Sequence, residues 1–104
     1  MIKVTVGYPN TPGARFDFDY YMNQHMPMVL DRLKPYGMSG YSVTKGLGGL
    51  IPGSAADTLV QCQLHFDAVE NIQRGVAAEG AGILGDIPNY TDISPKIQVD
   101  EVLA

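Results

Sequence analysis

Four stretches of the chain alternate apolar with polar residues, which is the pattern of strands that bury one face. They cover residues 2–8, 40–47, 58–66 and 96–103. Successive side chains of a strand point to opposite faces of its sheet, so each stretch has one apolar side. In 58–66 that side holds Val60, Cys62, Leu64 and Phe66. The sequence therefore predicts four strands.

The stretch 16–37 has the period of a helix instead. At about 100° per residue, one arc collects Phe18, Tyr21, Met22, His25, Val29 and Leu33. Asp17 is a suitable N-cap, so we expect the helix to begin near residue 17. Pro27 lacks a backbone N–H, which predicts a kink, or a restart as a second short helix, at 25–27. Gly37 can take a positive φ and ends the run.

A second helix is predicted from residue 68. Its apolar face holds Val69, Ile72, Val76 and Ile83. Asp67 and Glu70 have the spacing of a capping box, which satisfies free backbone N–H groups at a helix start. We expect Gly80 and Gly82 to loosen the far end before the turn-rich segment 86–90.

The predicted order is strand, helix, strand, strand, helix, strand, in a chain of 104 residues that forms one domain by length. This order is typical of a ferredoxin-like α+β sandwich with a four-stranded antiparallel sheet. The stretch 46–57 is too rich in glycine for a regular element, so we expect a mobile loop that could cover a pocket.

Two helices cover only one face of such a sheet. The other face is expected to carry Gln61, Gln63 and His65, with Tyr41 or Ser42. This set is too polar for the core of a monomer but suits a partly polar interface. We therefore expect a homodimer joined through the helix-free sheet face.

The composition, with 45% hydrophobic and 17% charged residues, is ordinary for a globular protein. The net charge is −4 and no run of Lys or Arg could follow a phosphate backbone, so nucleic acid is not an expected partner. No apolar run approaches the roughly 20 residues of a membrane span. Cys62 is the single cysteine and the start lacks a signal-peptide pattern, so we expect a cytoplasmic protein.

His25 is the strongest chemical candidate, because an imidazole can take or give a proton near neutral pH. Tyr21 lies one helical turn earlier and could orient the ring or share a substrate oxygen with it. Alternatively, His25 satisfies a carbonyl that Pro27 leaves free, and Tyr21 belongs to the core. His25 and His65 have no third ligand at metal spacing, and the glycines near residue 48 lack a P-loop lysine. We expect neither metal nor cofactor.

Two separated motifs resemble those of the EthD family, and the resemblance spans nearly the whole chain. The first motif is carried by Asp19, Tyr20, Tyr21, His25 and Pro27, and the second by Pro88, Tyr90, Thr91, Asp92 and Pro95. The family is named for ethyl tert-butyl ether degradation beside a cytochrome P450 system. It is similar to small monooxygenases and isomerases of the dimeric α/β barrel type, and the resemblance implies that fold here.

The resemblance also implies that Tyr90 and Asp92 lie near the mouth of a cavity or across a dimer. Asp92 could then fix the tautomer of His25, or it could simply cap a turn while Tyr90 holds the loop. His65 could line a polar tunnel between the two sheets or lie in a hydrated interface.

The sequence thus predicts a small cofactor-free enzyme that acts on an apolar or aromatic molecule by oxidation, isomerisation or cyclisation through proton transfer. Its expected catalytic residues are His25, Tyr21 and Asp92. Its expected substrate-binding residues are Phe18, Met22, Val29, Tyr90 and His65. The alternative is a noncatalytic carrier of a small apolar molecule for a partner oxygenase, which needs only an apolar pocket.

Overall fold

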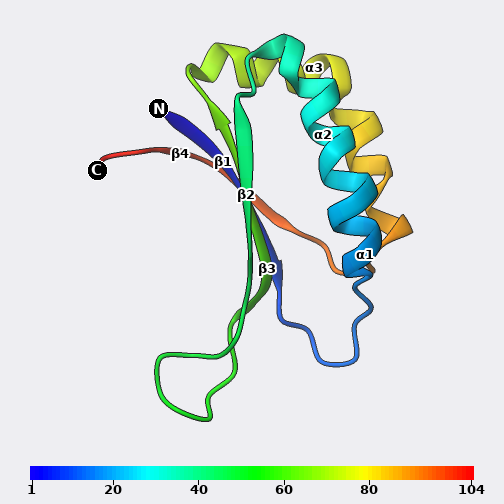
Figure 1. The fold of residues 1–104 in the computed structure, drawn as a ribbon, viewed down its shortest axis with the longest axis vertical. Helices are drawn as coiled ribbons and strands as arrows, with labels where there is room; N and C mark the ends of the chain where they lie inside the picture. Colours follow the sequence, from blue (N-terminus) through cyan, green and yellow to red (C-terminus); the bar gives the residue numbers. More distant parts are fainter.

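The computed structural model describes residues 1–104 and has the predicted order of elements (Figure 1). One antiparallel sheet, in the order β2-β3-β1-β4, is formed by β1 (Ile2–Pro9), β2 (Gly40–Lys45), β3 (Thr58–Phe66) and β4 (Lys96–Glu101). The helices α1 (Phe18–Tyr20), α2 (Met26–Leu33) and α3 (Val69–Gly85) form a second layer. The ferredoxin-like prediction is confirmed, although β2 and β4 end earlier than their sequence patterns suggested.

The register of the sheet separates an apolar face from a polar one. Val4 pairs with Leu64 and Val99, and these side chains point toward the helices. The next residue, Thr5, pairs with Gln63 and Gln98 on the helix-free face. The core therefore lies between the sheet and the helices.

On β2, the register assigns Ser42 and Tyr41 to different faces. Ser42 pairs with Gln63 on the helix-free face, as predicted. Tyr41 pairs with Leu64 and packs against the core, so of the two predicted alternatives it is Ser42 that lies on the helix-free face.

A second short helix, α2, begins at Met26, which confirms the predicted restart at 25–27. Asp17 caps α1 by accepting a hydrogen bond from the backbone of Tyr20, and a π-helical turn (Tyr21–His25) then leads into α2. Within that turn the N–H of Met26 donates to the carbonyl of Tyr21, five residues earlier. Pro27 has no backbone N–H, and the wider π turn before it accommodates this, because Pro27 then lies at the start of α2.

This π turn also changes which methionine is buried. A π turn contains one more residue than an α turn, so the residues after it are rotated relative to a regular helix. Met22, predicted on the buried face, is 42% exposed, whereas Met26 is 1% exposed. The assignment of Met22 to substrate binding is therefore corrected.

Two predictions for α3 were wrong. The helix begins after Ala68, which acts as N-cap without a side-chain hydrogen bond, so Asp67 forms no capping box. The helix also continues through Gly80 and Gly82 to Gly85. Packing explains this continuity: Gly75 lies against Leu33 and Tyr36, where an added Cβ would come within 3.0 Å of the leucine. Small residues on α3 let the two long helices approach closely.

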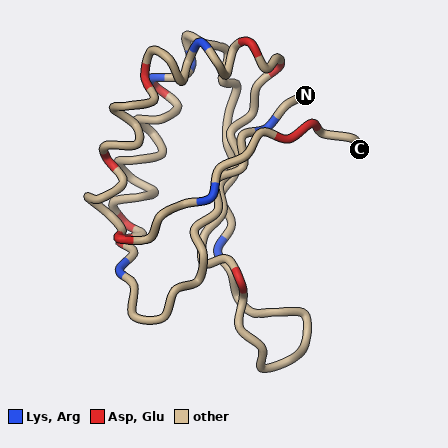
Figure 2. Tube along the Cα trace, turned by 180° about the vertical axis from the view of Figure 1, so that it is seen from behind, with Lys and Arg blue, Asp and Glu red and all other residues tan.

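The outer parts of the molecule contain the glycine-rich loop and the charges. Residues 46–57 form an irregular loop at the end of the sheet remote from α2 and α3 (Figure 1). Figure 2 shows Lys and Arg scattered over both layers and the loops. No helix is long and apolar enough to cross a membrane.

Candidate functional site

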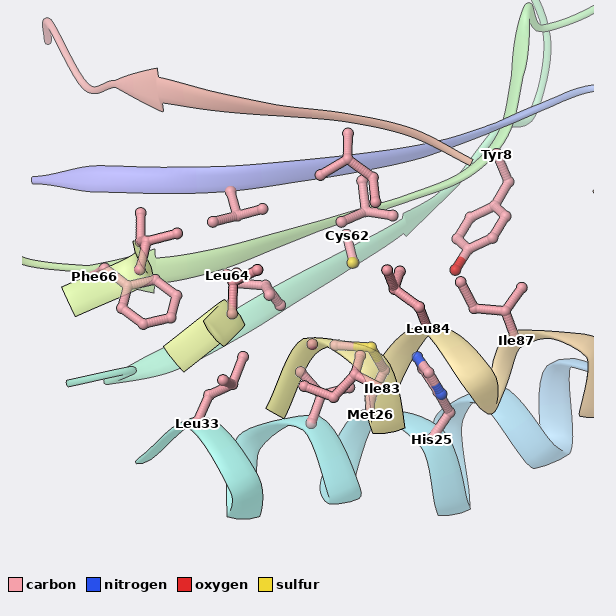
Figure 3. Close-up of a pocket in the computed structure, with 17 residues that line it drawn as sticks. Tyr8, His25, Met26, Leu33, Cys62, Leu64, Phe66, Ile83, Leu84 and Ile87 are labelled. Atoms are coloured by element: carbon pink, nitrogen blue, oxygen red, sulfur yellow. The ribbon is translucent and has the colours of Figure 1, made fainter. Parts of the chain in front are cut away.

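A cavity of about 190 Å³ lies between the sheet and the helices (Figure 3). Almost all of its wall is apolar, with residues from β1, β3 and β4 on one side and from α2 and α3 on the other. Its polar groups are the imidazole of His25, the hydroxyl of Tyr8 and the thiol of Cys62. No residue of the loop 46–57 lines it, so the loop is not a lid.

His25 ends the π turn and is 4% exposed. Both of its ring nitrogens have hydrogen-bond partners. Nδ1 lies 2.8 Å from Oδ2 of Asp86, and Nε2 lies 3.2 Å from the hydroxyl oxygen of Tyr90. The imidazole is therefore held on two sides while its ring borders the cavity.

Asp86 follows the last residue of α3 and collects three hydrogen bonds. Besides His25, the Tyr20 hydroxyl donates to Oδ1 at 2.7 Å and the Asn89 side chain donates to Oδ1 at 2.9 Å. Partial burial raises the pKa of the Asp86 carboxyl, but these hydrogen bonds outweigh it and hold the pKa below its usual value. Asp86 is thus a carboxylate near neutral pH.

An ionised carboxylate only accepts hydrogen bonds, so Nδ1 of His25 carries a proton and donates it to Asp86. Burial lowers the pKa of His25 below its usual value, although Asp86 acts in the opposite direction. The ring is therefore neutral near pH 7, and its Nε2 lone pair accepts a hydrogen bond from Tyr90.

Tyr90 connects His25 to Tyr8, since the two tyrosine hydroxyl oxygens are 2.5 Å apart. Burial raises the pKa of Tyr8 to about 12 and also raises the pKa of Tyr90. Both phenols are therefore protonated, and the hydrogen bonds run from Tyr8 to Tyr90 to His25 to Asp86. We call these four residues the relay. Figure 3 shows the Tyr8 oxygen pointing from the sheet toward the helices.

Tyr21 supports this arrangement by packing. Its ring is stacked on that of His25, with centroids 5.7 Å apart and planes 16° apart. Its hydroxyl is buried without a hydrogen-bond partner, so it does not orient the imidazole through a hydrogen bond as predicted. Edge contacts with Phe16 and Tyr8 complete an aromatic cluster around the relay.

The structure assigns the predicted carboxylate role to another residue. Asp92 accepts a hydrogen bond from the backbone N–H of Arg15 at 2.9 Å, so it caps a loop and does not contact His25. Asp86 occupies the position expected of Asp92. The short helical turn Ile87–Asn89 separates the two carboxylates, and the chain reaches the Arg15 backbone at Asp92, after Tyr90 has contacted His25.

The predicted substrate-binding residues are also divided. Val29 lines the cavity. Tyr90 does not line it, but its hydroxyl is hydrogen-bonded to that of Tyr8, which does. Phe18 packs on Phe16 beside the aromatic cluster, outside the cavity wall. His65 lies on the helix-free face, where it pairs with Lys3, and its Nε2 is buried without a partner.

Tyr8 was not predicted as a site residue. In the sequence it is the last residue of an alternating strand, and only the register of the sheet brings it beside Tyr90.

No group of three or more His, Cys, Asp and Glu side chains is placed to bind a metal ion.

The fold and the cavity define a ferredoxin-like protein with an apolar cavity and a buried histidine. Neither the family models nor the curated proteins give a match to the sequence. Among solved structures, an EthD-like protein from Ralstonia eutropha JMP134 is 47% identical, covers 99% of this chain and 92% of its own, and has a TM-score of 0.93. The chain belongs to the EthD-like family, as its motifs predicted.

Two more distant structures are similar in fold alone. An EthD family protein from Bacillus halodurans C-125 is 18% identical, with 99% of each chain covered and a TM-score of 0.67. A protein from Arabidopsis thaliana is 9% identical, with 100% of this chain and 97% of that chain covered and a TM-score of 0.70.

Proposed function

We propose that the protein is an enzyme that moves a proton on an apolar phenol or enolisable carbonyl compound bound in the cavity. The observation that carries the proposal is the relay at the wall of an otherwise apolar cavity. A buried histidine held by a carboxylate, with a hydroxyl between it and the ligand space, is an arrangement suited to general acid and base chemistry.

In this proposal a proton leaves the O–H of a phenol, or the α-carbon of a carbonyl compound, for the oxygen of Tyr8. A proton then moves from Tyr8 to Tyr90 and from Tyr90 to Nε2 of His25, while Tyr8 receives the substrate proton. Asp86 stabilises the imidazolium that forms, because its negative charge lies 2.8 Å from Nδ1. The substrate becomes an enolate or phenolate, which is electron-rich at carbon. It can then take a proton back at carbon, close a ring or react with an oxidant.

The test is hydrogen–deuterium exchange at carbon in a panel of aryl ketones and phenols dissolved in D₂O, followed by mass spectrometry. We expect wild-type protein to accelerate exchange of at least one compound. His25→Gln should reduce that rate by about 10²- to 10⁴-fold, the range typical of a general acid or base. Tyr41→Phe is the matched control, because Tyr41 lies on β2 outside the relay, and it should keep the rate.

The carrier function remains the competing proposal, supported by the apolar wall of the cavity. A carrier would bind the same compounds without accelerating exchange, and His25→Gln would leave binding unchanged. Acceleration that survives His25→Gln in folded protein would also refute the relay mechanism.

A further inference from the structure

The wall of the cavity changes from exposed to buried along its length. Three lining residues are about half exposed: Val76 at 56%, Leu84 at 51% and Ile97 at 51%. By contrast, Leu33, Ile72 and Phe66 line it with exposures of 5% or less. The cavity therefore has an open side and a closed end.

The open side lies between α3 and the edge strand β4. On α3, Val76, Gly80 and Leu84 are four residues apart, so they form one row along the helix. Ile97 faces this row from β4, where its pairing with Val6 directs it to the helix side. Gly80 has no side chain, and an added Cβ would meet only Val76, at 3.2 Å. We call the four residues Val76, Gly80, Leu84 and Ile97 the mouth.

The relay lies at one end of the cavity and the closed end lies at the other. Figure 3 shows Tyr8, His25, Leu84 and Ile87 together, with Leu33 and Phe66 at the opposite end. Cys62 and Phe66, which mark the middle and the closed end on β3, are four residues apart, or about 13 Å in a strand. Beyond His25 and Tyr8, no nitrogen or oxygen of a side chain lines the cavity.

We infer that the protein selects molecules with one polar head and one apolar tail, and that they enter tail first through the mouth. The tail fills the space toward Leu33 and Phe66, where a second polar group would find no hydrogen-bond partner. The head stays beside Tyr8 and His25. This inference rests on the proposed function only for the position of the head, and it makes Ile97 and Gly80 determinants of the width of tail admitted.

The test is the dissociation constant of straight-chain primary alcohols of increasing length, measured by NMR titration of the isotopically labelled protein. Affinity should rise about fourfold for each added methylene until the closed end is reached. A diol of matched length, with its second hydroxyl at the far end of the chain, should bind about tenfold more weakly.

The mouth is tested by Ile97→Trp, which should weaken binding of the best alcohol about tenfold. Val99→Trp is the matched control, because Val99 lies two residues further on the same face of β4, is 49% exposed and does not line the cavity. It should bind within about twofold of wild type. Equal effects of the two substitutions, or equal affinity for the alcohol and the diol, would overturn the inference.

His25→Gln separates this inference from the proposed function. The variant should keep the dependence on chain length even though it loses exchange catalysis. If wild-type protein binds with this dependence but catalyses no exchange, the proposed function fails and the selection of one-headed molecules stands. If exchange occurs without dependence on chain length, the inference fails alone.

Discussion

At the scale of single residues, the site depends on how two hydrogen bonds fix the state of His25. Asp86 accepts a hydrogen bond from Nδ1 and the Tyr90 hydroxyl donates one to Nε2, so the imidazole has one tautomer. Burial lowers the pKa of His25, which favours the neutral ring. A neutral ring beside a carboxylate can accept a proton and be stabilised once charged.

These pKa shifts predict how the free energy of unfolding depends on pH. The pKa values of both His25 and Asp86 are lower in the folded state than their usual values. The unfolded chain therefore binds these protons first as pH falls, and folding loses stability. We expect the urea midpoint to decrease as pH falls below about 6.5, the ordinary pKa of histidine, and to decrease further as Asp86 titrates.

His25→Gln is the comparison for this experiment. It should remove the part of the decrease that begins near pH 6.5 and leave the more acidic part. A wild-type midpoint that rises between pH 7 and pH 5 would contradict the lowered pKa of His25. The variant should also cost about 1–3 kcal/mol of stability, because one of two buried partners loses its hydrogen bond.

His25 could be predicted as a site residue from the sequence, because its helical phase and the nearby Pro27 are local signals. Asp86 and Tyr8 could not, since each meets the relay only through tertiary contacts: Asp86 is 61 residues from His25, and Tyr8 is 82 from Tyr90. The prediction of Asp92 followed the second motif, which includes Asp92 but not Asp86 and does not specify the path of the loop.

At the scale of elements, the alternation of β3 was read correctly to the residue, because its burial alternates without interruption. The π turn was not predictable in the same way. Pro27 indicated a disturbance, but an inserted residue and a kink have the same sequence signal. α3 ends before the segment 86–90 as predicted, but it stays helical through Gly80 and Gly82, although intrinsic propensity disfavours glycine within a helix.

The end of the first helical run supplies a prediction at this scale. Gly37 has φ of +93°, and a Cβ added there would lie 2.9 Å from Nδ2 of Asn71. Gly13 has φ of +78° with nothing within 4 Å. Gly13→Ala should cost about 1 kcal/mol for the left-handed backbone alone, and Gly37→Ala should cost more. Chemical denaturation measures both, and an equal or smaller cost at Gly37 would contradict the contact with α3.

At the scale of the whole molecule, one sheet face has no helix above it. That face holds Thr5, Gln61, Gln63 and His65, and the buried Nε2 of His65 lacks a partner within the chain. The fold is ferredoxin-like, with the helices on the opposite face of the sheet. We therefore predict a homodimer joined through this face, which would cover its mixed polar surface.

Sedimentation equilibrium at micromolar concentration should give twice the mass of the chain. Gln61→Lys places a charge on the helix-free face of β3 and should shift the dimer toward monomer, because it repeats in both subunits. Gln24→Lys, on the exposed side of the π turn, should not. A monomer mass for wild type would contradict this assembly and leave the helix-free face as ordinary surface.

The central claim is that His25 is a neutral base whose Nε2 accepts a hydrogen bond from Tyr90 and is connected to the cavity through Tyr90 and Tyr8. The most direct measurement is nitrogen NMR of the labelled imidazole of His25 during pH titration and titration with a cavity ligand. We predict a protonated Nδ1 and an unprotonated Nε2 at pH 7, a pKa below about 6.5, and a shift of Nε2 when the ligand binds. A protonated Nε2 at pH 7, or an Nε2 chemical shift that does not change when the ligand binds, would contradict the account.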